Sequence, residues 1–105
     1  MKPYRVRYMA AAIRQLGSIY RWIAADTGVS AADSFEEGLL GYLDGFATAP
    51  KRGTVRLRER GIRTVGWKRT VTIAFVVDEQ AATVVILAIY YRGRNVDRAI
   101  RRLKR

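Results

Sequence analysis

Hydrophobic and polar positions alternate at the start of the chain and then change their period. In residues 4–8 three apolar side chains alternate with two arginines, which predicts a strand with one covered face. From Ala10 onward the apolar spacing becomes three and four, which predicts an amphipathic helix. Its apolar stripe consists of Ile13, Leu16, Tyr20 and Ile23. Gly28 is suited to ending this helix.

A second helix is predicted after Gly28. The Ser-Ala-Ala-Asp sequence at residues 30–33 resembles a capping box, in which the side chains of Ser30 and Asp33 would bind free backbone N–H groups. The apolar stripe that follows is Ala32, Phe35, Leu39, Leu43 and Phe46. Pro50 and Gly53 end the segment, so we expect the two helices to pack as a hairpin.

Residues 61–67, 70–78 and 83–91 have the composition of strands. The last of these is apolar at almost every position, which predicts an interior strand covered on both faces. The short connection at 78–82 predicts that the last two strands pair antiparallel. Strict alternation predicts two sets of residues that share a face: Thr70, Thr72, Ala74 and Val76 on one strand, and Val84, Ile86 and Ala88 on the next.

The tail at 95–105 has the spacing of a short amphipathic helix. Its apolar side consists of Val96, Ala99, Ile100 and Leu103, surrounded by basic residues. The predicted order is therefore strand, helix, helix, three strands and a final helix. We expect an α+β fold in which residues 1–105 form one domain.

The composition excludes several kinds of chemistry. The chain has no Cys and no His, so disulfides, structural zinc sites and the common nucleophile–base pairs are absent. We expect no metal and no cofactor. Arg14 and Gln15 interrupt the only apolar run near the N-terminus, so neither a signal peptide nor a membrane span is predicted. We expect a soluble protein of the cytoplasm.

The formal charge of +11 belongs to the second half of the chain. Residues 1–50 contain five basic and five acidic residues, whereas residues 51–105 contain fifteen basic and four acidic ones. Such a one-sided positive field favours an acidic partner, either a nucleic acid or an acidic protein segment. The alternative is a solvated basic face with no partner.

Four segments, taken together and in order, resemble a known family. They are residues 4–24, 31–53, 61–77 and 86–98. The chain is similar along nearly its whole length to toxins of the ParE/RelE superfamily from bacterial type II toxin–antitoxin systems. This resemblance implies a helical hairpin packed on a small twisted antiparallel sheet. It also implies a role in growth arrest and plasmid stabilisation, and a cognate antitoxin whose acidic C-terminal segment folds over the toxin in a hetero-oligomer.

Two activities divide that superfamily. RelE-like members cut messenger RNA on the ribosome, whereas ParE-like members inhibit DNA gyrase. RNA cleavage requires a group that accepts the 2′-OH proton and cations that stabilise the phosphorane. The candidates in this chain are Glu59, Arg63, Lys68 and Tyr91. They are poor in proton acceptors near neutral pH, so the sequence favours a gyrase inhibitor, with a metal-independent mRNA interferase as the alternative.

The segment Ala-Ile-Tyr-Tyr-Arg-Gly-Arg-Asn at 88–95 is similar to the place where the last strand of these toxins leaves the sheet. Because adjacent strand residues face opposite sides, we predict that Tyr90 packs and Tyr91 lies at the surface. Gly93 is expected to supply a positive φ at the strand exit. The residues proposed to contact the target are Tyr91, Arg92 and Arg94.

A row of arginines precedes the second predicted strand. If residues 55–60 are extended, Arg56, Arg58 and Arg60 share one side, opposite Val55 and Leu57. With Arg63 they are predicted to bind the acidic antitoxin segment; a charged edge strand that resists aggregation is the alternative. Trp22 and Trp67 are predicted to pack rather than to stack on nucleic acid bases.

A third function class is a basic protein that only binds RNA or DNA. The sequence isoelectric point of about 10.9 is compatible with it. The chain lacks the aromatic ribonucleoprotein signatures and a helix-turn-helix pattern, so this class ranks last.

Overall fold

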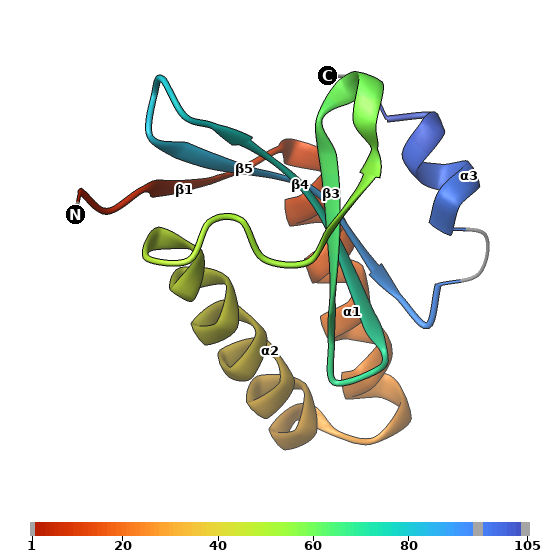
Figure 1. Ribbon diagram of the computed structural model, residues 1–105. Coiled ribbons are helices and arrows are strands. Elements are labelled where there is room, and N and C mark those ends of the chain that lie inside the picture. Colours follow the sequence, from red (N-terminus) through yellow and green to blue (C-terminus); the bar gives the residue numbers. More distant parts are fainter. Residues whose placement is uncertain (1, 94–95, 104–105) are drawn as a thin grey trace.

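A computed structural model describes residues 2–93 and 96–103 of the protein (Figure 1). Five strands and three α-helices follow one another in the predicted order, with one additional strand. They are β1 (Arg5–Tyr8), α1 (Ala10–Asp26), α2 (Val29–Asp44), β2 (Thr54–Leu57), β3 (Ile62–Trp67), β4 (Val71–Asp78), β5 (Thr83–Tyr91) and α3 (Val96–Arg101). Short 3-10 turns follow α2 at Gly45–Ala47 and β2 at Arg58–Arg60.

The five strands form one sheet in the order β1-β5-β4-β3-β2. The predicted α+β fold class is confirmed, and β5 is an interior strand as expected. Four neighbouring strands pair antiparallel, while β1 lies parallel to β5, with Val6 opposite Val84. A parallel pair is feasible here because the helical hairpin and three strands separate β1 from β5 along the chain.

Helices cover the two faces of the sheet unequally. The face toward α1 and α2, called here the hairpin face, contributes Val71, Ile73, Phe75, Val84, Ile86 and Ile89 to the larger core. The opposite face, called the α3 face, contributes Leu57, Ile62, Ala74, Val76, Leu87 and Ala88 to a smaller cluster around Ile100. Figure 1 shows α3 apart from the hairpin and beside β2 and β3. No helix among the described residues is long and apolar enough to cross a membrane.

A bulge in β5 explains why that strand is apolar at nearly every position. Ala74 pairs with Ala88, but the next residue, Phe75, pairs with Ile86, so Leu87 is an additional residue. Both Leu87 and Ala88 consequently contribute to the cluster on the α3 face. The prediction that Ala88 shares a face with Val84 and Ile86 was therefore wrong, because strict alternation does not survive a bulge.

Helix α1 is rotated relative to the predicted stripe. Ile13 is 59% exposed, whereas Ile19, which lies outside the predicted stripe, is buried with Ala12 and Ile23. The reason is that α1 contacts both α2 and β5, so its buried side is set by two neighbours. A single apolar stripe does not specify that direction.

The predicted capping box does not form. Gly28, with φ of 135°, precedes the first residue of α2, and no side chain caps the helix. Ser30 lies inside the helix, and the carboxylate of Asp33 accepts a hydrogen bond from the hydroxyl of Tyr20 on α1. Asp33 therefore joins the two helices instead of capping one of them.

Two arginines hold the connection between α2 and β2. Arg52 donates a hydrogen bond to the carbonyl oxygen of Tyr42 at 3.0 Å. Arg63 donates from Nε to the carbonyl oxygen of Arg52 at 3.2 Å and from its terminal nitrogen to that of Lys51 at 3.0 Å. Gly53 adopts φ of 67° and lies so close to β3 that an added Cβ would be 2.0 Å from the carbonyl oxygen of Thr64.

Replacing Gly53 with alanine should lower the free energy of unfolding by about 2 kcal/mol or more, because the new methyl group meets rigid backbone at a positive φ. The matched control is Gly41→Ala in α2, where nothing lies within 4 Å of the added Cβ. That variant should gain about 0.5–1 kcal/mol from helix propensity. Urea unfolding measures both values, and equal effects in the two variants would contradict the close packing at Gly53.

Candidate functional site

The four arginines predicted to form one row divide between the two faces of the sheet. Arg56 lies on the α3 face and forms an ion pair with Asp97 at the start of α3. Arg60 donates hydrogen bonds to the carbonyl oxygens of Arg101 and Leu103, at 3.0 and 2.7 Å. These two side chains therefore hold the C-terminal helix. The expected row is broken because β2 ends at Leu57 and the chain turns at Arg58–Arg60.

Arg58 and Arg63 lie together on the hairpin side of the sheet. They line an open groove of about 290 Å³ with Val55, Val77 and Glu79. Lys51, which also lines this groove, forms an ion pair with Glu79. Arg58 is exposed, whereas Arg63 is largely engaged with the carbonyl groups of the preceding loop.

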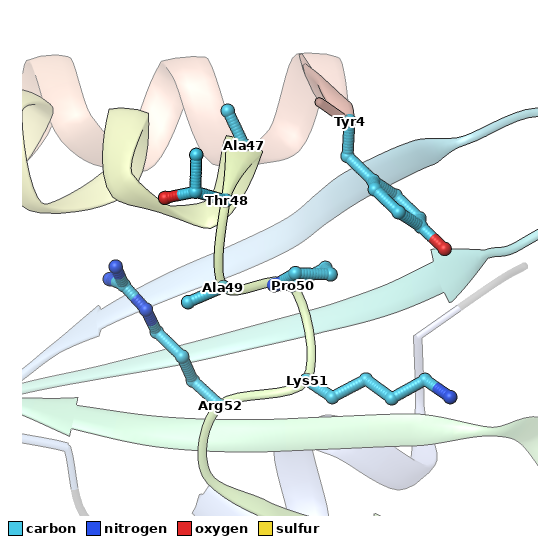
Figure 2. Close-up of a pocket in the computed structure, with 7 residues that line it drawn as sticks. All are labelled: Tyr4, Ala47, Thr48, Ala49, Pro50, Lys51 and Arg52. Carbon is cyan, nitrogen blue, oxygen red and sulfur yellow. The ribbon is translucent and has the colours of Figure 1, made fainter. Parts of the chain in front are cut away.

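A second open groove of about 520 Å³ adjoins the first and shares Lys51 with it. Figure 2 shows the ring of Tyr4 on one side and the loop through Pro50 and Lys51 on the other. The side chains of Lys51 and Arg52 extend to different sides of that loop (Figure 2). We call the two adjoining hollows the basic groove. It combines apolar side chains with cations and therefore suits a partner segment that has both apolar and acidic residues.

The four candidate catalytic residues do not converge. Glu59 belongs to the turn before β3, and Lys68 follows the last residue of the same strand. Six strand residues at about 3.3 Å each separate the two ends by roughly 20 Å. Arg63 is bound to loop carbonyls on the hairpin face, and Tyr91 pairs with Val71 at the far end of β4. These residues therefore do not form one active centre.

The middle of the α3 face carries no charged side chain on β3, β4 or β5 within the described residues. The residues there are Ile62, Thr64, Gly66, Thr72, Ala74, Val76, Val85, Leu87, Ala88 and Tyr90. Asp78, at the end of β4, accepts a hydrogen bond from the backbone N–H of Ala81 in the following turn. Burial raises the pKa of Tyr90 above its usual value, so this phenol keeps its proton at neutral pH and does not act as a base.

Aromatic and cationic side chains gather at the end of the sheet where β3 turns into β4 and β5 ends. We call this group the aromatic–cationic corner; it consists of Trp22, Trp67, Lys68, Arg69, Tyr91 and Arg92. The ring centroids of Trp22 and Tyr91 are 5.7 Å apart. The guanidinium of Arg92 lies 4.9 Å from the Trp22 ring, and the Lys68 ammonium lies 4.9 Å from the Trp67 ring.

Sequence reasoning named Lys68, Tyr91 and Arg92 as candidate site residues but did not predict that they gather with Trp22 and Trp67. Trp22 comes from α1, Trp67 from β3 and Tyr91 from β5, so no local cluster is visible along the chain. The predicted packing role is partly right, since Trp67 packs edge-on against Phe35. Trp22, however, is 45% exposed. The one signal of this corner in the sequence is that Trp67, Lys68 and Arg69 are consecutive residues.

Tyr90 and Tyr91 do face opposite sides of the sheet, as predicted. Tyr90 packs with the α3-face cluster, but Tyr91 is half-buried against Phe35 and Trp22 rather than free at the surface. The positive φ predicted for Gly93 falls on Arg92, at 52°. Gly93 is instead needed for space, because an added Cβ would be 2.8 Å from Val96. Arg94 lies outside the described residues.

Comparison with protein families decides the classification. Residues 6–96 match the model of the ParE toxin of the type II toxin–antitoxin system parDE. The chain belongs to the ParE toxin family. This match spans most of β1 to the start of α3, so it includes the aromatic–cationic corner and, apart from Tyr4, the basic groove. The sequence has no match among curated proteins.

Solved structures share the fold of this ParE-family chain. A chain of the chromosomal ParDE toxin–antitoxin system of P. aeruginosa aligns with a TM-score of 0.72 and 17% identity, covering 86% of this chain and 97% of that one. The toxin–antitoxin complex RelBE2 of Mycobacterium tuberculosis gives 0.67 and 22%, covering 90% and 97%. A free arginine-to-alanine double mutant of E. coli RelE gives 0.60 and 11%, covering 92% of both chains.

Replacing Tyr90 with phenylalanine should change how stability depends on alkaline pH. The pKa of Tyr90 is raised in the folded protein, so between the unfolded value of about 10 and the folded one the native state holds more protons. Its contribution to stability is therefore complete below about pH 10 and is lost above it. Urea unfolding from about pH 8 to about pH 11 should show that the free energy of unfolding falls more steeply with pH in the parent than in Tyr90→Phe. Equal slopes in the two proteins would show that the hydroxyl is well hydrated.

Proposed function

We propose that this ParE-family toxin inhibits DNA gyrase by binding and that a cognate antitoxin neutralises it. The main support is the middle of the α3 face, which carries no charged side chain among the described residues and where Tyr90, with a pKa raised by burial, keeps its proton at neutral pH. A ribonuclease needs a proton acceptor and cations around one phosphate. The residues that could supply them, Glu59 and Lys68, are attached to opposite ends of β3. The proposal places the protein in the cytoplasm, where gyrase acts.

The target contact in this proposal includes Tyr91 and Arg92. Arg92 follows β5 directly, and its backbone N–H donates to the carbonyl oxygen of Thr70 at 2.7 Å, which anchors the segment. The side chain is exposed beyond that anchor. A rigid backbone that presents an exposed cation suits binding to an anionic or polar target surface.

The antitoxin in this proposal lies in the basic groove. The groove offers the apolar surfaces of Tyr4, Pro50 and Val55 beside the exposed cation Arg58, while Lys51 is already paired with Glu79. An antitoxin segment with alternating apolar and acidic residues complements both properties, and a disordered segment that folds on binding can follow such an extended surface. This location replaces the predicted row, because Arg56 and Arg60 hold α3 on the other face.

The gyrase proposal predicts that the purified toxin blocks DNA supercoiling by gyrase or accumulates gyrase–DNA cleavage complexes. Addition of the cognate antitoxin should restore supercoiling at about equimolar ratio, because it covers the toxin. A supercoiling assay on plasmid DNA, with and without that protein, measures both effects.

A translating extract is the counter-experiment. If the toxin cuts messenger RNA there while gyrase remains fully active, the gyrase proposal is wrong and the RelE-like activity is correct. Tyr90→Phe should leave gyrase inhibition unchanged, because the variant loses only one half-buried hydroxyl.

The groove proposal predicts that Arg58→Glu weakens antitoxin binding by about tenfold or more, because the new carboxylate repels an acidic segment. The loss should be larger at low salt, since an exposed charge is screened at high salt. Arg21→Glu, at an exposed position near the C-terminal end of α1, makes the same charge change away from the groove and should alter the affinity less than about twofold. Titration calorimetry with the cognate antitoxin measures both affinities, and equal losses would place the antitoxin elsewhere.

A further inference from the structure

The aromatic–cationic corner carries three cations that lack anionic partners. Within the described residues Lys68, Arg69 and Arg92 form no ion pair, and the contacts of Lys68 and Arg92 are with aromatic rings. Asp26, one helical turn beyond Trp22, accepts a hydrogen bond from the hydroxyl of Thr27 instead. The corner therefore has uncompensated positive charge that an external anion could neutralise.

The backbone at this corner is strained. Lys68, Arg69 and Arg92 all have positive φ, at 50°, 62° and 52°. Glycine and asparagine adopt this region readily, whereas long side chains there cost of order 1–2 kcal/mol each. Three of the four non-glycine residues with positive φ in the described chain are thus cations at one corner. A cation is present at each position despite this cost, which indicates a role for the charges.

The rings of the corner form a rigid platform. Tyr91 is tilted by 56° against Trp22 and packs edge-on to Phe35, which in turn packs edge-on to Trp67. The outermost ring, Trp22, is nevertheless 45% exposed. The guanidinium of Arg92 lies over this indole, 4.9 Å from its centroid, so a base would stack on the part of the ring that Arg92 leaves exposed while the phosphates bind the cations.

We propose that the aromatic–cationic corner binds single-stranded nucleic acid. One base stacks on Trp22, and Lys68, Arg69 and Arg92 contact the phosphates on either side. Each nucleotide combines a flat ring with an anion, so an unpaired strand satisfies both features of the corner. A duplex keeps its bases stacked inside, and an acidic peptide satisfies only the charges.

A neighbouring groove gives the strand a path beyond the corner. It has a volume of about 570 Å³, runs between α1 and the end of β5, and is lined by Arg14, Gln15, Ser18 and Tyr91 among others. Tyr91 lines this groove and also packs in the corner, so the two adjoin at this residue. The exposed Arg14 supplies a fourth cation for the backbone of the strand.

This proposal shares Tyr91 and Arg92 with the proposed gyrase contact, but it concerns a ligand that the isolated protein binds and is therefore tested without gyrase. The probe is a fluorescein-labelled oligonucleotide of about ten unpaired nucleotides, within the site sizes known for such surfaces. Anisotropy titrations with oligo-dT, oligo-U and a duplex of the same length compare the ligands. The single strands should bind about tenfold or more tightly than the duplex, and the two single-stranded arms distinguish DNA from RNA as the source.

Variants of the corner test the assignment of residues. Trp22→Ala should lower the affinity by about tenfold, and Trp22→Phe should restore much of it because a ring remains for stacking. Arg92→Ala should weaken binding and reduce the slope of log affinity against log salt by about one. Arg102→Ala removes the same charge elsewhere and should change the affinity less than about twofold.

Three outcomes would overturn the proposal. One is equal binding of duplex and single strands, and another is an equal loss in Arg92→Ala and Arg102→Ala. The third is full competition by poly-glutamate at equal charge, which would assign the corner to an acidic protein partner. Circular dichroism checks that each variant is folded. If Trp22→Ala unfolds, the affinities of Trp22→Phe and Arg92→Ala still test the proposal. If the oligonucleotides do not bind the corner but the toxin still inhibits gyrase, only the nucleic-acid proposal is wrong and the proposed function stands.

Discussion

The pairing of β4 with β5 is the interaction on which the rest of the structure depends. These two strands occupy the interior of the sheet, and their side chains supply most of the sheet's contribution to both clusters of buried residues. A hairpin buried on both faces requires a helix layer on each, because neither face is polar enough to remain in water. The α1–α2 hairpin therefore covers one face, and the short α3 covers part of the other.

The apolar character of β4 and β5 also determines where the basic side chains of the second half lie. Because β4 and β5 carry no basic residue, the basic residues of the second half lie in β2 and β3, in turns and loops, and in the C-terminal helix. Some of them are used for construction: Arg56 and Arg60 hold α3, while Arg52 and Arg63 hold the loop before β2. The cations that remain for partners are those with no structural acceptor, such as Arg58 beside the basic groove and Lys68, Arg69 and Arg92 at the corner. The basic groove and the aromatic–cationic corner are thus two separate cationic surfaces on one small scaffold, as the proposed antitoxin and target contacts require.

The bulge in β5 has a functional consequence as well as a structural one. By adding one residue at Leu87, it directs Tyr91 toward the helical hairpin, where that ring contacts Trp22 and Phe35. With strict alternation from Val84, Tyr91 would lie on the α3 face, and the aromatic platform would be incomplete. The position of a single inserted residue therefore decides which face carries the exposed aromatic surface.

The amino-acid sequence by itself determined the order of elements, the α+β class, the interior position of β5 and the resemblance to the ParE/RelE superfamily, because these depend on local period and on turn residues. It also indicated that Trp67, Lys68 and Arg69 are adjacent. Only the tertiary structure decided the parallel pairing of β1, the exposure of Ile13, the separation of Arg56 and Arg60 from Arg58 and Arg63, and the meeting of Trp22 with Arg92. The physical reason is that each of these depends on contacts between segments far apart in the chain, where a bulge, a turn or a second packing neighbour changes the direction of a side chain without changing the local pattern.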